Sequence, residues 1–280
     1  MQACDRLPPD LADAFASEER RLAPLVPPIL FFDSVGSTND IASQLAADGR
    51  REGGVVVAQR QTAGRGRRGR TWFSPPTSGL YVSTLLDPAR AQQNVPRAVA
   101  LLTLSAGVAL VEGIASATGL RVGLKWPNDL VVGGRKMAGI LAETVVPPDA
   151  LTRPTAGPVV LGYGINVAAG AFPPELSERA TSLETEANRP VPRARVLVET
   201  LAALARRYHD LVAGRYDAIL DAWRGYAPGA VGSTVSWETH TGRREGVTAG
   251  VDDDGALLVD VDGRVERLVG GEVIWHGIPG

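Results

Sequence analysis

The strongest constraint on the fold is the pair Gly133-Gly134, which lies between two runs of strand-forming residues. Two adjacent glycines favour the tight turn of a β-hairpin, because they adopt positive φ angles at little cost. Asp129–Val132 precedes this turn and Arg135–Thr144 follows it, so the sequence predicts a hairpin near the middle of the chain. Strands joined by a hairpin pair antiparallel, so a sheet made only of parallel strands is excluded.

Strands and helices alternate through the first 228 residues, which predicts a mixed α/β domain. Ser37 has the side chain of a helix N-cap, and Gly49 suits the position just after the helix that follows. Residues 147–158 are rich in proline and predict an exposed loop. The other expected elements are strands over Gly54–Arg60, Gly79–Leu86, Val122–Trp126 and Pro158–Val167, a helix over Pro96–Thr118, and a helical region Pro192–Tyr226 interrupted near Gly214.

The character of the chain changes after Pro228-Gly229. Residues 230–280 contain five short β-type runs separated by turn-forming segments, which predicts a small all-β module. We therefore expect three parts: an N-terminal extension over residues 1–28, the main α/β domain over 29–228, and the β module over 229–280.

The composition is that of a soluble globular protein, with 44% apolar and 21% charged residues and a net charge of −2. This charge argues against general binding to nucleic acid or to a membrane surface. The single cysteine, Cys4, lies in an N-terminus expected to fray, so neither a disulfide within one chain nor a cysteine zinc site is expected. The N-terminus does not read as a signal peptide, and no segment reads as apolar enough to span a membrane; Ala98–Ala117, for example, is broken by polar residues. We expect a cytoplasmic protein.

The most unusual segment is Gln61–Arg70, which places four arginines and three glycines in ten residues. Glycines let backbone N–H groups approach an anion closely, and arginines add bidentate donors, so the loop is suited to phosphate or carboxylate. A loop that contacts nucleic acid and a solvated loop without a function are the alternatives. A buried strand enters this loop and Trp72-Phe73 leave it, which favours a loop that orders over a small anionic ligand.

Lysine is rare in the chain, which has 27 arginines but only Lys125 and Lys136. A compact ammonium can bridge oxygens of two different reactants where a planar guanidinium does not fit. Lys136 and Asp129 flank the predicted hairpin, so strand pairing would bring them together. Asp129 could orient an amine, accept a proton or hold a metal ion. Taken singly, each of these residues is better explained as a surface charge or, for Asp129, as a turn former.

The three histidines, at positions 209, 240 and 276, lie far apart and outside these segments, so histidine catalysis and a histidine metal site are disfavoured. Ser37 has no accompanying histidine or nucleophile-elbow motif, so we expect a capping role rather than a nucleophile.

Four segments together resemble the biotin protein ligases: FFDSVGSTND, QTAGRGRRGRTWFSPP with GLYVSTLL, LKWPNDLVVGGRKMAGILAE, and GYGINV. The resemblance covers roughly residues 30–190 strongly and the C-terminal module in kind. It implies a catalytic domain like that of class II aminoacyl-tRNA synthetases, with a mixed sheet flanked by helices, and a small SH3-like β-barrel at the C-terminus.

The resemblance also implies a reaction in two steps. The carboxylate of biotin would attack the α-phosphorus of MgATP, giving biotinyl-5′-AMP and pyrophosphate. A lysine of a biotin carboxyl carrier protein would then attack this mixed anhydride. The implied small molecules are therefore biotin and ATP with Mg²⁺, whose protein ligands the sequence does not identify. No nucleic acid or membrane partner is implied, and a homodimer is possible.

Site residues follow from the resemblance by position. Lys136, Arg67 and Asp129 would be catalytic, with Lys136 bridging the carboxylate and the α-phosphate and Asp129 serving the acceptor lysine or the metal. The biotin site would comprise Ser37, Thr38, Asn39, Gln61, Gly64, Arg65, Gly66, Arg67, Lys136 and Gly139. The ATP site would comprise Arg67, Arg68, Trp72, Asn128, Lys136 and Asn166.

The chain departs from the family pattern in two places. Fewer than about thirty residues precede the first motif, too few for the DNA-binding domain of bifunctional members, so we expect no such role. Members often carry an aromatic residue near the TSLE segment that packs on adenine, whereas Arg179 and Ala180 stand here. Lipoate-type ligation is the alternative within enzymes, and the Arg/Gly loop argues against it. A nucleic-acid-binding module is the alternative outside them.

Overall fold

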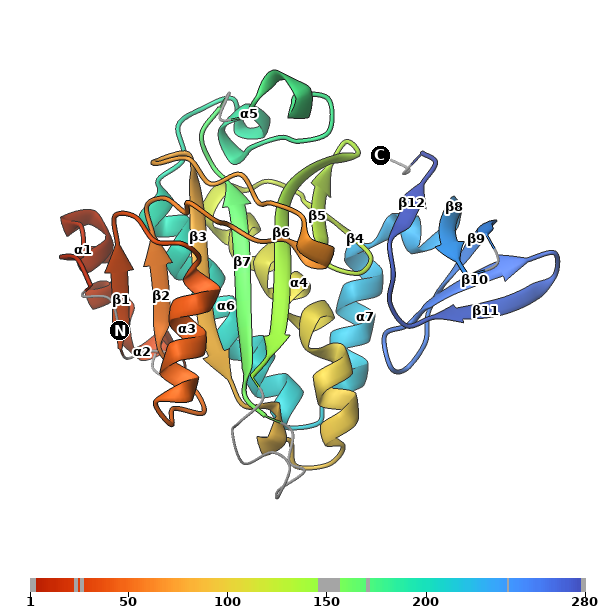
Figure 1. Cartoon of the computed structure of the whole chain (residues 1–280), viewed down its shortest axis with the longest axis horizontal. Helices are drawn as coiled ribbons and strands as arrows, with labels where there is room; N and C mark the ends of the chain where they lie inside the picture. The colour runs from red at the N-terminus through yellow and green to blue at the C-terminus, as the bar shows by residue number, and fades with distance from the viewer. Residues whose placement is uncertain are drawn as a thin grey trace.

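The computed structural model describes residues 4–22, 25, 28–145, 157–169, 172–240 and 242–277. Figure 1 shows a large unit, in which helices cover a central sheet, and a smaller β unit beside it. Within these residues the large sheet has the order β1-β2-β3-β7-β6-β5-β4. The strands are β1 (Ile29–Phe32), β2 (Val55–Ala58), β3 (Gly79–Leu86), β4 (Gly123–Lys125), β5 (Asp129–Val132), β6 (Arg135–Thr144) and β7 (Val159–Asn166).

The large sheet is mixed, as the sequence predicted. β1 and β2 pair parallel, and every other pair in it is antiparallel. The predicted hairpin is β5–β6, whose turn contains Gly133 and Gly134, both at positive φ. The predicted bounds of β3, β5 and β6 coincide with the observed ones, and those of β2, β4 and β7 differ by one or two residues at an end.

Two layers of helices enclose the sheet. α4 (Val95–Thr118), α6 (Arg193–Val212) and α7 (Tyr216–Tyr226) bury apolar residues in the main core on one face. α3 (Thr38–Ala47) packs on β2, β3 and β7 on the other face, around a second core. α3 covers only part of that face, and the Arg/Gly loop crosses in front of β7 and β6 (Figure 1).

The apolar character of α4 corrects one expectation. By length and composition alone this helix could cross a membrane, whereas no such segment was expected from the sequence. In the fold, 72% of its most apolar window is buried, because α4 packs between the sheet and α6. Its composition is therefore that of a central core helix.

The N-terminal residues also differ from expectation. Instead of fraying, they form α1 (Pro9–Ser17) and α2 (Glu19–Leu22), which pack against α6. Leu11, Phe15 and Leu22 are buried, and Asp5 forms an antiparallel bridge with Phe31 at the edge strand. Cys4 is exposed. The predicted proline-rich loop at 147–158 lies almost entirely outside the described residues.

A second sheet with the order β11-β10-β9-β8-β12 forms the small unit, close to the predicted start of the C-terminal module. Its core side chains Trp237 and Leu257 belong to the same buried cluster as the large unit, and Trp126 Nε1 donates a 2.9 Å hydrogen bond to the carbonyl of Gly255. The division of the chain at residue 229 stays a prediction. The strands are β8 (Val231–Thr239), β9 (Gly242–Val251), β10 (Leu257–Val261), β11 (Arg264–Leu268) and β12 (Val273–Trp275).

Five short helical segments complete the described chain. They are α5 (Leu183–Ala187), η1 (Arg67–Gly69), η2 (Pro88–Arg90), η3 (Pro174–Leu176) and η4 (Pro228–Ala230).

Candidate active site

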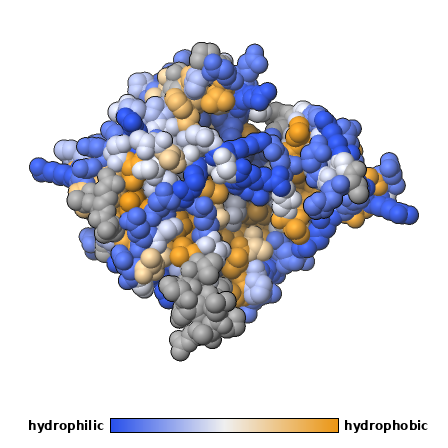
Figure 2. All heavy atoms as spheres, in the orientation of Figure 1, coloured by the Kyte–Doolittle hydropathy of each residue, from blue (hydrophilic) through white to orange (hydrophobic). Residues whose placement is uncertain are grey.

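A cavity of about 430 Å³ lies between the sheet, the Arg/Gly loop, the segment around η3 and the start of β12. In Figure 2, which has the orientation of Figure 1, hydrophilic side chains gather between the large and the small unit. All the sequence-predicted site residues line the cavity except Gly64. A Cβ on Gly64 would lie 2.5 Å from the carbonyl oxygen of Trp72, so this glycine allows the two ends of the loop to pack together.

The floor of the cavity is a row of glycines on β6 and β7. Gly139 and Gly164 are paired across the two strands, and Gly162 lies on the same face. Because no side chains rise from these positions, the sheet backbone is open to a ligand or to a side chain from another segment. The indole of Trp72 occupies part of this space, with Cζ3 at 3.2 Å from the place that a Cβ on Gly139 would take.

One end of the cavity is polar and is organised by Gln61. Its Oε1 accepts hydrogen bonds from the backbone N–H of Thr38 (2.9 Å) and from the Thr38 hydroxyl (3.1 Å), and its Nε2 donates to Ser74 Oγ (3.0 Å). Ser37 stands at the N-cap of α3 as predicted, but its hydroxyl makes no capping hydrogen bond. Gln61 Oε1 accepts the hydrogen bond from the first N–H of α3 instead. Ser37 lines the cavity.

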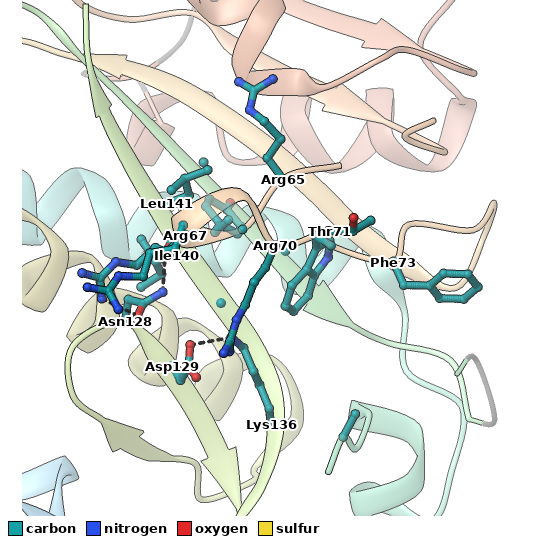
Figure 3. A pocket seen from close by; sticks show the side chains of 18 of the residues that line it. Arg65, Arg67, Arg70, Thr71, Phe73, Asn128, Asp129, Lys136, Ile140 and Leu141 are labelled. Atoms are coloured by element: carbon teal, nitrogen blue, oxygen red, sulfur yellow. Dashed lines mark hydrogen bonds and ion pairs between the residues drawn. The ribbon is translucent and has the colours of Figure 1, made fainter. Parts of the chain in front are cut away.

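Two of the four loop arginines form ion pairs with carboxylates of the protein, and two do not. Arg65 is held by Asp40 at 2.6 Å and by Glu143 at 3.2 Å, and Arg70 forms an ion pair with Glu272 of the C-terminal unit. Arg67 forms no ion pair with a described carboxylate and donates instead to Asn128 Oδ1 at 3.2 Å (Figure 3). Arg68 has a φ of 58°. Arg67 and Arg68 line the cavity and form no ion pair with a described carboxylate, so they are the loop cations best able to bind an anionic ligand.

Lys136 and Asp129 lie together, as their positions in the hairpin predicted. Lys136 Nζ is 2.5 Å from Asp129 Oδ1 and 5.4 Å from the ring centroid of Trp72. Figure 3 shows this pair on the opposite side of the cavity from Arg65. Arg67 donates to Asn128, the neighbour of Asp129, so a carboxylate or phosphate that enters the cavity would meet Lys136 and Arg67 together.

Burial changes the acid–base properties of two cations on the wall. It lowers the pKa of Lys125, an effect opposed by Asp129 and reinforced by Lys136. Burial also lowers the pKa of Arg67, and the charge of Arg68 lowers it further, while Asp129 opposes the shift. Both shifts arise mainly because burial disfavours the charged form of these side chains, and an anion bound beside them would offset that cost.

The segment around η3 closes the cavity near Lys136. The backbone N–H of Lys136 donates to the carbonyl of Arg179 at 2.7 Å, and Asn166 Nδ2 donates to the carbonyl of Thr181 at 3.1 Å. This side has no aromatic residue at Arg179 or Ala180, in line with the sequence, but Phe172 lines the cavity. Sequence reasoning missed Phe172, since nothing local marks it as part of the wall.

Other residues missed from the sequence are Ser83, Glu143 and Glu272. Ser83 and Glu143 lie within regular strands, where their residue types alone signal nothing, and Glu272 reaches the loop only through tertiary packing. Among the described residues no cluster of three or more histidine, cysteine, aspartate or glutamate side chains could hold a metal ion.

This geometry can bring two negatively charged reactants together. The cavity has a polar end made of hydroxyl and carboxamide groups, a glycine floor, and cations on facing walls. Fixed cations in a partly closed site stabilise the charge that develops when a carboxylate meets a phosphate.

Comparisons with known proteins agree with this arrangement. The biotin/lipoate A/B protein ligase family model matches residues 31–158. The bifunctional ligase/repressor BirA of Bacillus subtilis is 35% identical over 247 residues, which are 88% of this chain and 73% of that protein. The biotin–[acetyl-CoA-carboxylase] ligase of Paracoccus denitrificans is 33% identical over 248 residues, 86% of this chain and 98% of that protein.

The fold has solved counterparts. The biotin protein ligase of Aquifex aeolicus, in complex with biotin and ATP, is 26% identical and superimposes with a TM-score of 0.71 over 90% of this chain and 99% of its own. The extent of these relationships, over both units of the structure, shows that the resemblance noted in the four sequence motifs reflects common descent. The chain belongs to the biotin protein ligases of the biotin/lipoate A/B protein ligase family.

Proposed function

We propose that this protein is an ATP-dependent ligase that activates biotin to biotinyl-5′-AMP and transfers it to a lysine of a biotin carboxyl carrier protein. The observation that carries the proposal is that Lys136, paired with Asp129, and Arg67, bound to Asn128, line one cavity. The relatives with biotin–[acetyl-CoA-carboxylase] ligase names and the Aquifex complex with biotin and ATP support the same substrates.

In the first step the carboxylate of biotin attacks the α-phosphorus of ATP, and pyrophosphate leaves. Two anions must approach each other, so their repulsion has to be screened before the bond can form. In this proposal Lys136 contacts both the carboxylate and the α-phosphate, and Arg67, which has no described carboxylate partner, contacts the remaining phosphates. Charge that develops on the α-phosphate is stabilised by cations already in position.

In the second step the acceptor lysine, as a neutral amine, attacks the carbonyl of the mixed anhydride, and AMP leaves. Asp129 is the carboxylate beside the reaction centre and can orient the amine and take its proton. The loop also protects the anhydride, since a closed loop excludes water that would hydrolyse it.

Mg²⁺ would enter with ATP as part of the substrate. It prefers oxygen ligands and keeps several waters, so one or two carboxylates and the phosphates suffice to hold it. Asp129 and Glu272 line the cavity, and each would have to exchange its ion pair, with Lys136 and Arg70 respectively, to contact the ion. Mg²⁺ would screen the charge of the β- and γ-phosphates and improve pyrophosphate as a leaving group.

The proposed partner is the carrier domain of a biotin-dependent carboxylase, and the proposed location is the cytoplasm, where such carboxylases meet ATP. A homodimer is compatible with the fold. Lipoate-type ligation is disfavoured by the Arg/Gly loop and by the relatives, whose names specify biotin. Binding of nucleic acid through the loop is disfavoured, since two of its four arginines are engaged by carboxylates of the protein.

Biotin-dependent exchange of labelled pyrophosphate into ATP, with Mg²⁺ and no acceptor protein, tests the first step. We expect exchange that requires biotin and that lipoate does not support. Absence of exchange by folded protein would refute the proposal. Salt-dependent binding of nucleic acid by the wild type, weakened by Arg65→Ala with Arg67→Ala, would then support the binding module instead.

A further inference from the structure

The side chain of Ser83 is completely buried directly behind the polar end of the cavity. Ser83 is on β3, and its Oγ is 2.6 Å from Asn39 Oδ1 and 2.7 Å from Thr38 Oγ1. These two partners are consecutive residues at the start of α3 that line the cavity. Ser83 therefore contacts the proposed biotin site from behind.

The hydrogen bonds of Asn39 fix which way its carboxamide points. The carbonyl oxygen Oδ1 can only accept, so it receives the hydrogen of Ser83, and the nitrogen Nδ2 donates to Glu143 Oε2 at 2.6 Å. Rotating the amide by half a turn would set its N–H₂ group against the Ser83 hydroxyl and its oxygen against the Glu143 carboxylate. The second contact is repulsive, so a single orientation is stable.

The position of Asn39 is further fixed by the glycine floor. A Cβ on Gly162 would collide with Oδ1 of Asn39, so the carboxamide lies directly against the backbone of β7. With its oxygen and one N–H engaged by the protein, Asn39 offers one remaining N–H to a ligand. The orientation of this amide thus decides which hydrogen-bonding group biotin meets.

The same network reaches both ends of the arginine loop. Glu143 also accepts from Arg65 at 3.2 Å, at the start of the loop. On the other side, the backbone N–H of Thr38 donates to Gln61 Oε1, Gln61 Nε2 donates to Ser74 Oγ, and Ser74 Oγ donates to the carbonyl of Trp72 at 3.0 Å. The hydroxyl hydrogen of Thr38 is then left for Ser83 Oγ. Ser83 is the junction between these two branches.

We propose that Ser83 and Glu143 are positioning residues for biotin, which hold the Asn39 carboxamide in one orientation from its oxygen and its nitrogen side respectively. Both residues lie in segments that carry the family resemblance, but neither is among the site residues that the resemblance implies. The inference rests on the proposed function, because it names residues that act through Asn39 on the same substrate.

Thr84 provides a matched control. It follows Ser83 on the same strand, it is also completely buried, and it points to the opposite face of the sheet. Its Oγ1 has no hydrogen-bond partner, so Thr84→Val removes a buried hydroxyl without breaking a bond. Ser83→Ala removes a hydroxyl with two partners.

Calorimetric titration with biotin and steady-state kinetics with both substrates test the proposal. We expect Ser83→Ala to raise the Kd and the KM for biotin about five- to tenfold, the factor that one misplaced hydrogen bond corresponds to. The KM for ATP, and kcat at saturating biotin, should change less than about twofold, because Ser83 touches neither the nucleotide nor the reacting atoms. Thr84→Val should leave all four quantities unchanged.

Glu143 is tested by comparing two substitutions. Glu143→Ala should weaken biotin binding, whereas Glu143→Gln should restore much of it, because a glutamine oxygen can still accept from Asn39 Nδ2. In an Asn39→Ala background the effect of Ser83→Ala on biotin binding should largely disappear, since the two residues act as one unit.

The outcomes separate this inference from the proposed function. Wild-type protein that binds no biotin would overturn both. Wild-type protein that binds biotin while Ser83→Ala binds it equally well, or loses kcat instead of affinity, would overturn the positioning role alone. If Ser83→Ala weakens biotin binding equally in the Asn39→Ala background, then Ser83 does not act through Asn39.

Discussion

The indole of Trp72 lies directly on the backbone of Gly164, so that a Cβ on Gly164 would be 2.5 Å from indole Cε2 and 2.9 Å from Cζ2. Real Cβ atoms do not approach other atoms so closely, so the position of Trp72 requires glycine here. The contact fixes the C-terminal end of the arginine loop on the floor of the proposed active site.

Gly164→Ala should therefore displace Trp72 and loosen the loop. We expect a stability loss of roughly 1–3 kcal/mol from overpacking and a larger loss of biotin-dependent pyrophosphate exchange. Gly225→Ala is the control, because this glycine of α7 has an open position with nothing within 4 Å of a Cβ. Thermal unfolding and the exchange assay check both variants. Full pyrophosphate exchange by Gly164→Ala would show that activity does not require the contact between Trp72 and Gly164.

Lys136→Ala should nearly abolish adenylation, by roughly 10²–10³-fold, as expected for loss of a preorganised group at a developing charge. The fold should persist, since Lys136 is part-exposed and its main partner is Asp129. Lys136→Arg should not restore the rate, because a planar guanidinium cannot replace a compact ammonium between two reactants. Single-turnover formation of biotinyl-5′-AMP measures this, and near-normal turnover by either variant would contradict the assigned role.

Arg67 and Arg65 should differ in their effects. Arg67→Ala removes a cation without a described carboxylate partner, so we expect a weaker hold on ATP and on the acyl-adenylate with little change in stability. Arg65→Ala also leaves Asp40 and Glu143 without their shared partner, so it should disturb the loop itself. Biotinylation of an unrelated protein reports released intermediate. Equal retention by wild type and Arg67→Ala would argue against this role.

The lowered pKa of Lys125 predicts an upper pH limit for activity. Its pKa is lowered from the ordinary 10.5, mainly by burial. As the pH rises through this lowered pKa, the ammonium is lost and the cavity holds an ATP phosphate less well, so kcat/KM for ATP should fall. The limit should therefore lie below pH 10.5. Lys125→Arg should move it to higher pH, because arginine keeps its proton. A pH profile unchanged by this substitution would exclude Lys125 as the titrating group.

The lowered pKa of Lys125 also predicts how the folding stability depends on pH. A lysine with a lowered pKa binds its proton less tightly when folded than when unfolded, so its burial costs stability wherever the lysine is charged. That cost is complete below the folded pKa and declines as the pH rises toward 10.5. Lys125→Met should accordingly raise the melting temperature at neutral pH while it weakens ATP binding.

Local signals in the sequence were enough to predict much of the secondary structure. The glycine pair at 133–134 specified the hairpin, and Gly119, at positive φ, ends α4 where the sequence predicted. The hairpin in turn placed Lys136 beside Asp129, because strand pairing follows from the turn. The helices α1 and α2 were not predicted, since their stability comes from burial of Leu11 and Phe15 against α6 rather than from strong local propensity.

The sequence by itself determined the mixed α/β class and the lysine–aspartate pair, and it predicted an anion-binding role for the arginine loop, because turn chemistry, residue type and short-range pairing are local properties. Only the tertiary structure decided how each side chain is used. Ser37 stands at a helix start but does not cap it, two loop arginines are occupied by carboxylates from α3, β6 and the C-terminal unit, and Ser83 supports Asn39 from a strand 44 residues away. These roles depend on distances between segments that are remote in sequence, and such distances are set by packing of the whole core.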